Sequence, residues 1–329
     1  MSSLAPLLQS FFTDRLIRQR HASDNTIAAY RDTLRLLIGF VNQQTGKAPS
    51  NLAITDVDAQ TISSFLDHLQ TERHNSIRTR NLRLAAIHSL FRYAALVHPE
   101  HAQLIQRVLS IPPKRFETNI VTYLTDPEVD ALLAAPDQTT WIGRRDHALL
   151  VLGCQTGLRT SEMTGLTIDD VHLGTSPHVS CVGKGRKQRI TPLTTTTVRV
   201  LQHWLTEHAG APPDPLFPTR RGTALSRDAL ARLVSRHTAT AQTSCPTLTG
   251  KNVTPHTLRH TAAMRLLAAG IDSTVLALWL GHASTNSVQV YIHADLALKE
   301  RALARTTPHD APPGRYKPND TLIAFLNNL

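Results

Sequence analysis

A proline-containing, basic break between residues 111 and 115 most constrains how this chain can fold. Its letters are I-P-P-K-R, and proline removes a backbone donor and restricts the residue before it, so helices end there. The chain has 329 residues, a length that favours about two domains. We therefore expect a helical domain over residues 1–110, a linker over 111–120, a second domain over 121–307 and a tail over 308–329.

The segments before the break have the pattern of helices. Apolar residues recur at three- and four-residue spacing over residues 4–20. Side chains suited to capping predict further helix starts at Ser23 or its neighbour, at Asp56 and at Ser76. Leu82 is expected on the inner face of the helix that follows Ser76. The pattern predicts a small all-helical bundle.

The segments after the break combine helices with one hairpin. Thr125 and Glu128 form a capping box, which predicts a helix start. Two strand-like runs, 178–182 and 189–193, flank a short basic turn and predict a hairpin. Thr254 as a cap, followed by proline at the first helical position, predicts another helix. The expected fold class is mainly α with a small antiparallel β-sheet.

Basic side chains and one tyrosine gather between Thr254 and Tyr291, without a carboxylate cluster. His256, Arg259 and His260 are three and four residues apart, so on a helix they share a face. Preorganised cations stabilise the charge that develops when a phosphodiester is attacked, and arginine can hold two of its oxygens. The pattern favours a phenol that attacks a phosphodiester. A zinc site at the two histidines is disfavoured, because no glutamate follows the first.

The charge of the whole chain agrees with a polyanionic partner. Lysine and arginine number 35 against 25 acidic residues, a net charge of +10. A merely basic soluble protein is the alternative. We see neither a signal peptide nor a membrane span, and the scattered cysteines favour a reducing cytoplasm. Three arginines near a helix start could bind phosphates or form a solvated face: Arg78, Arg80 and Arg83.

Taken together, these residues resemble the tyrosine recombinase, or phage integrase, family. The resemblance is strongest from Leu124 to His293, and N-T-I-A-A-Y at 25–30 looks like the family's core-binding domain. It rests on five motifs in family order: Arg159 in T-G-L-R-T-S-E, Lys184 in G-K-G-R-K-Q-R, H-T-L-R-H at 256–260, L-G-H ending at His282, and Tyr291. It implies an N-terminal helical core-binding domain and an α+β catalytic domain.

The resemblance also implies roles for individual residues. Tyr291 is the nucleophile that joins to a 3′ phosphate of DNA. Arg159 and Arg259 hold the phosphate, and Lys184 protonates the leaving 5′ oxygen, with Lys187 as its rival.

Histidines and an acid complete the implied site. His256 assists proton transfer and contacts the phosphate, and His282 hydrogen-bonds the phosphate or positions the nucleophile. His260 and Glu162 support the site from behind, Glu162 through a structural hydrogen bond or ion pair. Lys187 and Arg189 of the hairpin are further candidates for DNA contact. No metal and no nucleotide cofactor is implied.

The function that follows is a site-specific DNA recombinase that cleaves and rejoins double-stranded DNA through a 3′-phosphotyrosine. We expect a tetramer on paired sites, with a second recombinase or accessory protein as a further partner, acting on nucleoid DNA. A role in integration or excision of a mobile element is a weaker expectation. The alternatives are a type IB topoisomerase-like enzyme and a catalytically silent DNA-binding accessory protein. The tail ends in an apolar helical stripe that could dock on a neighbour, because so short a helix does not stand alone in water.

Overall fold

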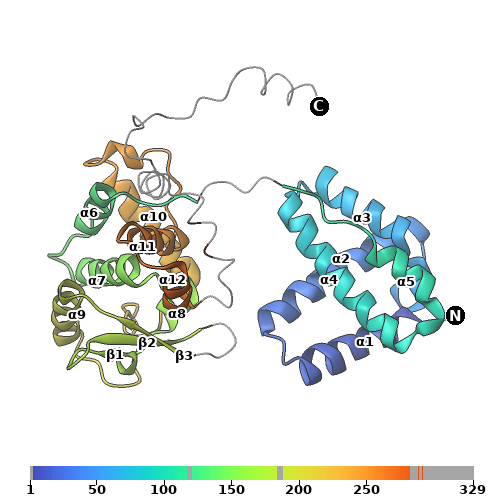
Figure 1. The fold of residues 1–329 in the computed structure, drawn as a ribbon, viewed down its shortest axis with the longest axis horizontal. Coiled ribbons are helices and arrows are strands. Elements are labelled where there is room, and N and C mark those ends of the chain that lie inside the picture. Colours follow the sequence, from blue (N-terminus) through green and yellow to red (C-terminus); the bar gives the residue numbers. More distant parts are fainter. Residues whose placement is uncertain (1–2, 117–120, 184–187, 282–287, 289–290, 292–329) are drawn as a thin grey trace, which may run out of the picture. The chain divides into compact units, whose positions relative to one another are not determined.

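The computed structural model of this chain describes residues 3–116, 121–183, 188–281, 288 and 291. The chain divides into two compact units, Met1–Thr118 and Asn119–Leu329. Helices predominate in both, and the second also holds a small antiparallel sheet (Figure 1), so the predicted fold class is confirmed. Among the helices described, none is both long enough and apolar enough to cross a membrane.

The N-terminal unit is a bundle of helices. Ser23 Oγ accepts a hydrogen bond from the Thr26 amide, and Ser76 Oγ accepts one from the Thr79 amide, so these predicted starts are confirmed. The third start was placed two residues early, because Asp58 caps that helix. The helices are α1 (Leu4–Ser10), its wider continuation η1 (Phe11–Gln19), α2 (Asp24–Thr45), α3 (Ala59–Thr71), α4 (Ile77–Val97) and α5 (Ala102–Leu109).

Helix α4 lies at the centre of this unit and contacts α2, α3 and α5. Its inner face carries Leu84, Ile87 and Phe91, all at most 2% exposed. Leu82 is 65% exposed, so its predicted burial was wrong. Residues two positions apart are about 200° apart around a helix, so Leu82 and Leu84 point in nearly opposite directions.

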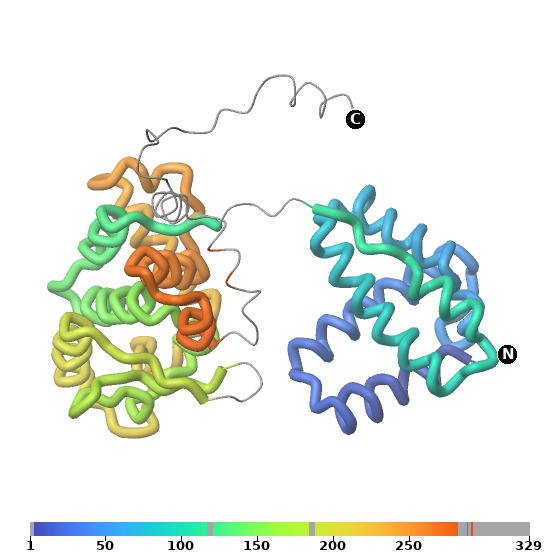
Figure 2. The backbone as a smooth tube through the Cα atoms, viewed as in Figure 1, coloured from blue at the N-terminus to red at the C-terminus, as the bar shows by residue number. Residues whose placement is uncertain are grey.

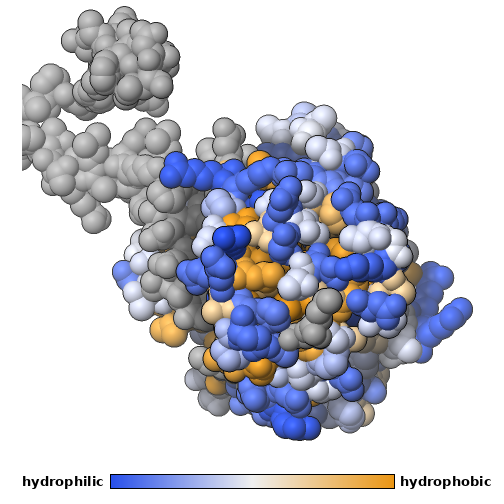
Figure 3. All heavy atoms as spheres, turned by 90° about the vertical axis from the view of Figure 1, so that its right-hand side faces the viewer, coloured by the Kyte–Doolittle hydropathy of each residue, from blue (hydrophilic) through white to orange (hydrophobic). Residues whose placement is uncertain are grey.

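In the space-filling view, hydrophilic residues surround an apolar area on the visible face (Figure 3).

The chain that leaves this unit stays attached to α4. Arg80 Nη1 donates to the Pro112 carbonyl at 3.2 Å, and the Asn81 amide group donates to the Lys114 carbonyl at 2.7 Å. Arg80 is 5% exposed, so it does not lie on a solvated face, and its contact with phosphate stays a prediction. Its guanidinium instead supports the first part of the predicted linker. Arg78 is exposed and Arg83 is half-buried.

The C-terminal unit surrounds one buried helix, α7. The sheet has the order β1-β2-β3, with Cys181 opposite Arg189, so the predicted hairpin is confirmed; its turn, residues 184–187, lies outside the described residues. The described elements are α6 (Asp126–Ala134), α7 (Trp141–Thr156), α8 (Thr160–Gly165), β1 (Val171–His172), β2 (His178–Val182), β3 (Gln188–Pro192), α9 (Thr195–His208), α10 (Arg227–Ala241), α11 (Pro255–Ala268) and α12 (Ser273–Leu280).

Helix α7 connects the core to the region of the predicted site. It packs against α9 and α11. It ends at Gly157, whose φ of +64° a side chain would disfavour. Helix α11 begins as predicted, with Thr254 Oγ1 accepting a hydrogen bond from the Thr257 amide. Helix α12 follows α11 (Figure 2) and contacts β3. Near the end of α7, Trp279 Nε1 of α12 donates to the Thr156 carbonyl and Gln155 Nε2 donates to the Pro192 carbonyl of β3, so the ends of α7 and α12 meet beside the sheet.

Candidate active site

Arg259 is the buried centre of the predicted site. Its side chain projects from α11, and the residue is 2% exposed. Nη1 donates to the Gly157 carbonyl and Nη2 donates to the Leu280 carbonyl, both at 2.7 Å. These carbonyls lie at the C-terminal ends of α7 and α12, where partial negative charge collects. Burial and the nearby charge of Arg159 lower the pKa of Arg259 to about 10, so it remains a cation at neutral pH.

Arg159 reaches the same end of α12. Its Nη2 donates to the Gly281 carbonyl at 2.8 Å, next to the carbonyl held by Arg259. Its side chain is 28% exposed, which leaves it accessible to a ligand. The two arginines are 100 residues apart in the sequence. The structure therefore brings together the two side chains that were predicted to hold a phosphate.

Glu162 holds two arginines in place. Oε1 accepts from Arg159 Nη1 at 2.8 Å, and Oε2 accepts from the Arg159 amide at 2.8 Å and from Arg189 Nη2 at 2.6 Å. The carboxylate side chain is 3% exposed. This geometry matches the structural ion pair expected for Glu162. A carboxylate occupied by two cations is poorly placed to act as a base.

Arg189 was predicted as a DNA contact of the hairpin, but the structure places it inside the site. Its side chain is 9% exposed, and a Cβ added to Gly281 would lie 2.8 Å from its Nη1. The alternation of side chains along the paired strands could have predicted that Arg189 is buried. Arg189 pairs with buried Cys181 across the sheet, and opposite residues of paired strands share a face.

Tyr291 lies beside the arginine cluster and is 3% exposed. Its hydroxyl is 3.1 Å from His260 Nδ1, and the two rings meet edge-on with centroids 5.3 Å apart. Burial raises the pKa of Tyr291, while the charge and hydrogen bond of Arg259 and the charge of Arg159 oppose this rise. The predicted nucleophile and both predicted phosphate-binding arginines are thus close enough to interact.

The remaining predicted residues divide into two groups. His256 is exposed, and its ring centroid is 4.2 Å from that of His260, one turn away on α11. Lys184, Lys187 and His282 lie outside the described residues. Within the described ranges, His, Cys, Asp and Glu side chains form no group of three that could hold a metal ion.

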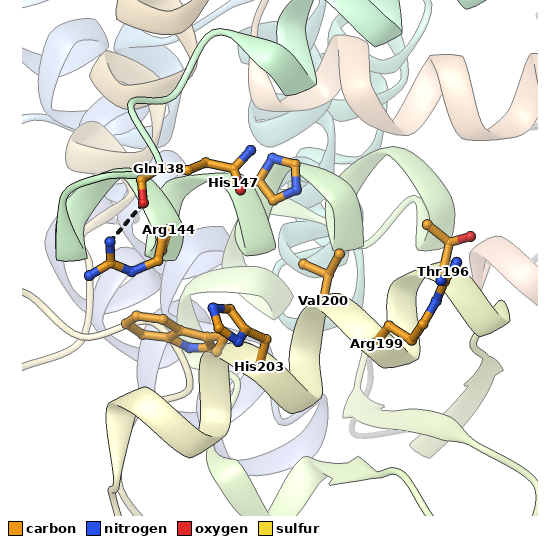
Figure 4. A pocket seen from close by; sticks show the side chains of 8 residues that line it. Gln138, Arg144, His147, Thr196, Arg199, Val200 and His203 are labelled. Atoms are coloured by element: carbon orange, nitrogen blue, oxygen red, sulfur yellow. Dashed lines mark hydrogen bonds between the residues drawn. The ribbon is translucent and has the colours of Figure 1, made fainter.

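A cavity of about 340 Å³ between α7 and α9 is separate from this cluster (Figure 4). His147 and Arg144 of α7 face His203 of α9 across it, and Trp204 also lines it. Arg144 is engaged by Glu207, with two contacts of 2.6 Å. None of the predicted site residues lines this cavity. The chemistry indicated by the sequence therefore belongs to the cluster around Arg259.

Comparison with known proteins agrees along the length of the chain. Residues 122–297 match the family described as "Phage integrase family", and residues 10–97 match "Phage integrase, N-terminal SAM-like domain". A Sinorhizobium fredii protein with a provisional integrase/recombinase name, y4rC, is 52% identical over 100% of this chain and 99% of its own length. Tyrosine recombinase XerC of Pelobacter propionicus is 34% identical over 89% and 93% of the two chains.

A solved structure shares the fold. It is the XerH site-specific recombinase bound to a palindromic difH substrate in a post-cleavage complex. It aligns with a TM-score of 0.69 at 24% identity, covering 87% of this chain and 81% of XerH. At this identity the likeness concerns the fold, and the residues of the site rest on their own geometry.

Proposed function

Because this chain belongs to the phage integrase family and is a tyrosine-type site-specific recombinase, we propose that Tyr291 is its nucleophile and forms a 3′-phosphotyrosine with duplex DNA. The observation that carries this proposal is the position of the Tyr291 phenol beside Arg259 and Arg159. A phosphodiester attacked by a phenol gathers negative charge on its non-bridging oxygens. Fixed guanidinium groups at that position stabilise this charge without reorganising.

The two arginines would share the phosphate. A guanidinium has five N–H donors, and the contacts of Arg259 to two carbonyls leave further hydrogens for an anion. Arg159, with its side chain 28% exposed, offers the more open set of donors. Arg259 would then define the depth of the site, and Arg159 would meet the phosphate from the solvent side.

Proton transfer completes the proposed reaction. Lys184 protonates the 5′ oxygen as the P–O5′ bond breaks, and His256 and His282 contact the phosphate. The phosphotyrosine bond conserves the energy of the broken bond, so a 5′ hydroxyl of a partner strand can attack it and reseal the DNA. The proposed chemistry needs no nucleotide cofactor.

The wider assignment follows from the family and the net charge. We propose double-stranded DNA as the substrate, a tetramer on paired sites, and the nucleoid of the cytoplasm as the place of action. Arg78, Arg83 and Lys187 are proposed contacts to the DNA backbone. The tail from residue 308 is proposed to dock on a neighbouring protomer, and a second recombinase or accessory protein is a further proposed partner. Integration or excision of a mobile element is the proposed role.

Tyr291→Phe tests the nucleophile. Phenylalanine keeps the ring in its apolar surroundings and removes the attacking oxygen. We expect unchanged DNA binding and complete loss of covalent capture on a nicked suicide duplex that carries a site selected from flanking genomic DNA. Tyr123→Phe is a matched control, since Tyr123 packs against the same apolar cluster, and it should still form the adduct. An adduct formed by the Tyr291→Phe protein would refute the assignment.

A plasmid relaxation assay and the suicide duplex separate the alternatives. A topoisomerase-like enzyme would relax a supercoiled plasmid that lacks paired sites. A catalytically silent accessory protein would bind the duplex and never become covalently attached.

A further inference from the structure

The contact between Tyr291 and His260 gives His260 a more direct position than a supporting role requires. The hydroxyl and Nδ1 are 3.1 Å apart, a distance across which a proton can pass. The two residues are 31 positions apart in the sequence, so this contact depends on the way the chain returns to α11 after α12. The edge-on packing of the rings, at 62°, orients the imidazole toward the phenol oxygen.

Within the part of the chain that the structure describes, the other charged groups of this cluster are poorly suited to accept the phenol proton. Both oxygens of Glu162 receive hydrogen bonds from arginines. Arg259 and Arg159 are cations with no free lone pair. Among the described residues near the phenol, His260 combines contact with the hydroxyl and a basic nitrogen.

Exposure increases outward from the phenol. Tyr291 is 3% exposed, His260 is half-buried, and His256 is exposed with its ring 4.2 Å from that of His260. A proton released at the buried oxygen would therefore move toward solvent along one face of α11. The bound phosphate would add a negative charge beside the imidazolium that forms, which favours the charged ring.

We propose that His260 is a catalytic residue, whose Nδ1 takes the proton of Tyr291 as the phenol oxygen attacks. This inference rests on the proposed function, because it requires Tyr291 to be the nucleophile. The Oη–P bond forms, the P–O5′ bond breaks, and the phenol proton goes to Nδ1. The proton delivered to the 5′ oxygen comes from a separate group, proposed above as Lys184. In the resealing step, the proton returns from Nδ1 to the phenol as it leaves.

The rate of adduct formation on the nicked suicide duplex tests this proposal. General-base assistance accelerates a reaction about 10²–10⁴-fold, so His260→Ala should lower the rate by about 100-fold or more. Added imidazole should recover part of the loss, because it can occupy the vacated space and accept the proton. His260→Gln should stay slow, since its amide can hold the hydroxyl without taking its proton. Each rate is expressed per DNA-bound protein molecule, so partial unfolding of a variant does not lower the measured rate.

A duplex with sulfur in place of the 5′ bridging oxygen identifies which proton His260 handles. A thiolate leaves without protonation, so this substrate should restore the rate of a variant that lacks the leaving-group acid. It should not restore the rate of His260→Ala. Recovery of His260→Ala on this substrate would overturn the proposal. So would a rate for His260→Gln or His260→Ala within about threefold of the unmodified protein.

The assay separates this inference from the proposed function. An adduct formed by Tyr291→Phe, or no adduct formed by the unmodified protein, would remove the nucleophile itself. If Tyr291→Phe forms no adduct and His260→Ala forms the adduct at the rate of the unmodified protein, Tyr291 remains the nucleophile and only the role of His260 is rejected.

Discussion

Glu162→Gln should destabilise the catalytic unit and slow cleavage together. The carboxylate side chain is 3% exposed and neutralises Arg189, whose side chain is 9% exposed, as well as Arg159, whose side chain is 28% exposed. Glutamine fills nearly the same volume but brings no charge. It would leave the buried guanidinium of Arg189 without its counterion, next to two other arginines.

The expected size follows from the exposure of each partner. Removing one member of a fully buried ion pair costs about 3–5 kcal/mol. The pair with Arg189 approaches that case, whereas the pair with Arg159 is partly solvated and adds less. Glutamine also keeps one hydrogen-bond acceptor. We therefore expect the free energy of unfolding to fall by about 2–4 kcal/mol, which lowers Tm by roughly 5–10 °C for a domain of this size.

Calorimetry and guanidinium denaturation measure the loss, and the suicide duplex measures the accompanying fall in adduct rate. Asp126→Asn is a matched control in the same unit. Its ion pair with Arg265 has a similar distance, 3.0 Å, but the side chains are 72% and 48% exposed, so its removal should cost less than about 1 kcal/mol. If Glu162→Gln costs no more than this control, the carboxylate does not hold the arginine cluster together.

Three further predictions concern the catalytic unit. Gly157→Ala should lower the free energy of unfolding by about 1–3 kcal/mol, because φ is +64° and the new Cβ would lie 3.1 Å from two neighbours; unchanged guanidinium denaturation would contradict this. Burial raises the pKa of the Cys154 thiol to about 12, so iodoacetamide at pH 8 should modify Cys245 much faster, and equal rates by mass spectrometry would oppose the reasoning. Burial of Asp146 disfavours its charge, but hydrogen bonds from His237 and Arg145 and their charges outweigh this and lower its pKa. The stabilisation from Asp146 is therefore complete above the ordinary carboxyl pKa and is lost as pH falls through the lowered pKa. The free energy of unfolding, measured from pH 7 to 2, should decline below about pH 4, and Asp146→Asn should reduce this decline. Identical pH profiles for the two proteins would count against this reasoning.

Local signals in the sequence predicted much of this structure. Ser23, Ser76 and Thr254 cap helices through hydrogen bonds to residues three positions later, so only a short stretch of chain decides them. The hairpin could be predicted for a similar reason, since its strands are neighbours in the sequence. The fold class and the family follow from patterns of this kind.

Contacts over long sequence distances were harder to predict. Arg80 is buried because the carbonyl of Pro112, 32 residues later, lies against it. Arg189 enters the site because Glu162, 27 residues earlier, offers a buried carboxylate. The residue pattern and the family resemblance both placed Tyr291 and Arg259 in one site, but the contact between Tyr291 and His260 became visible only in the folded chain.

The double attachment of Arg259 affects how inactive relatives should be recognised. Its guanidinium fastens the end of α7 to the end of α12, so a lineage that stopped cutting DNA would still need that arginine to keep its shape. Retention of Arg259 is therefore a poor sign that a relative is still catalytically active. The Tyr291 hydroxyl contacts the His260 side chain and, among the described residues, fastens no helix end, so its loss would be a better sign that activity has been lost.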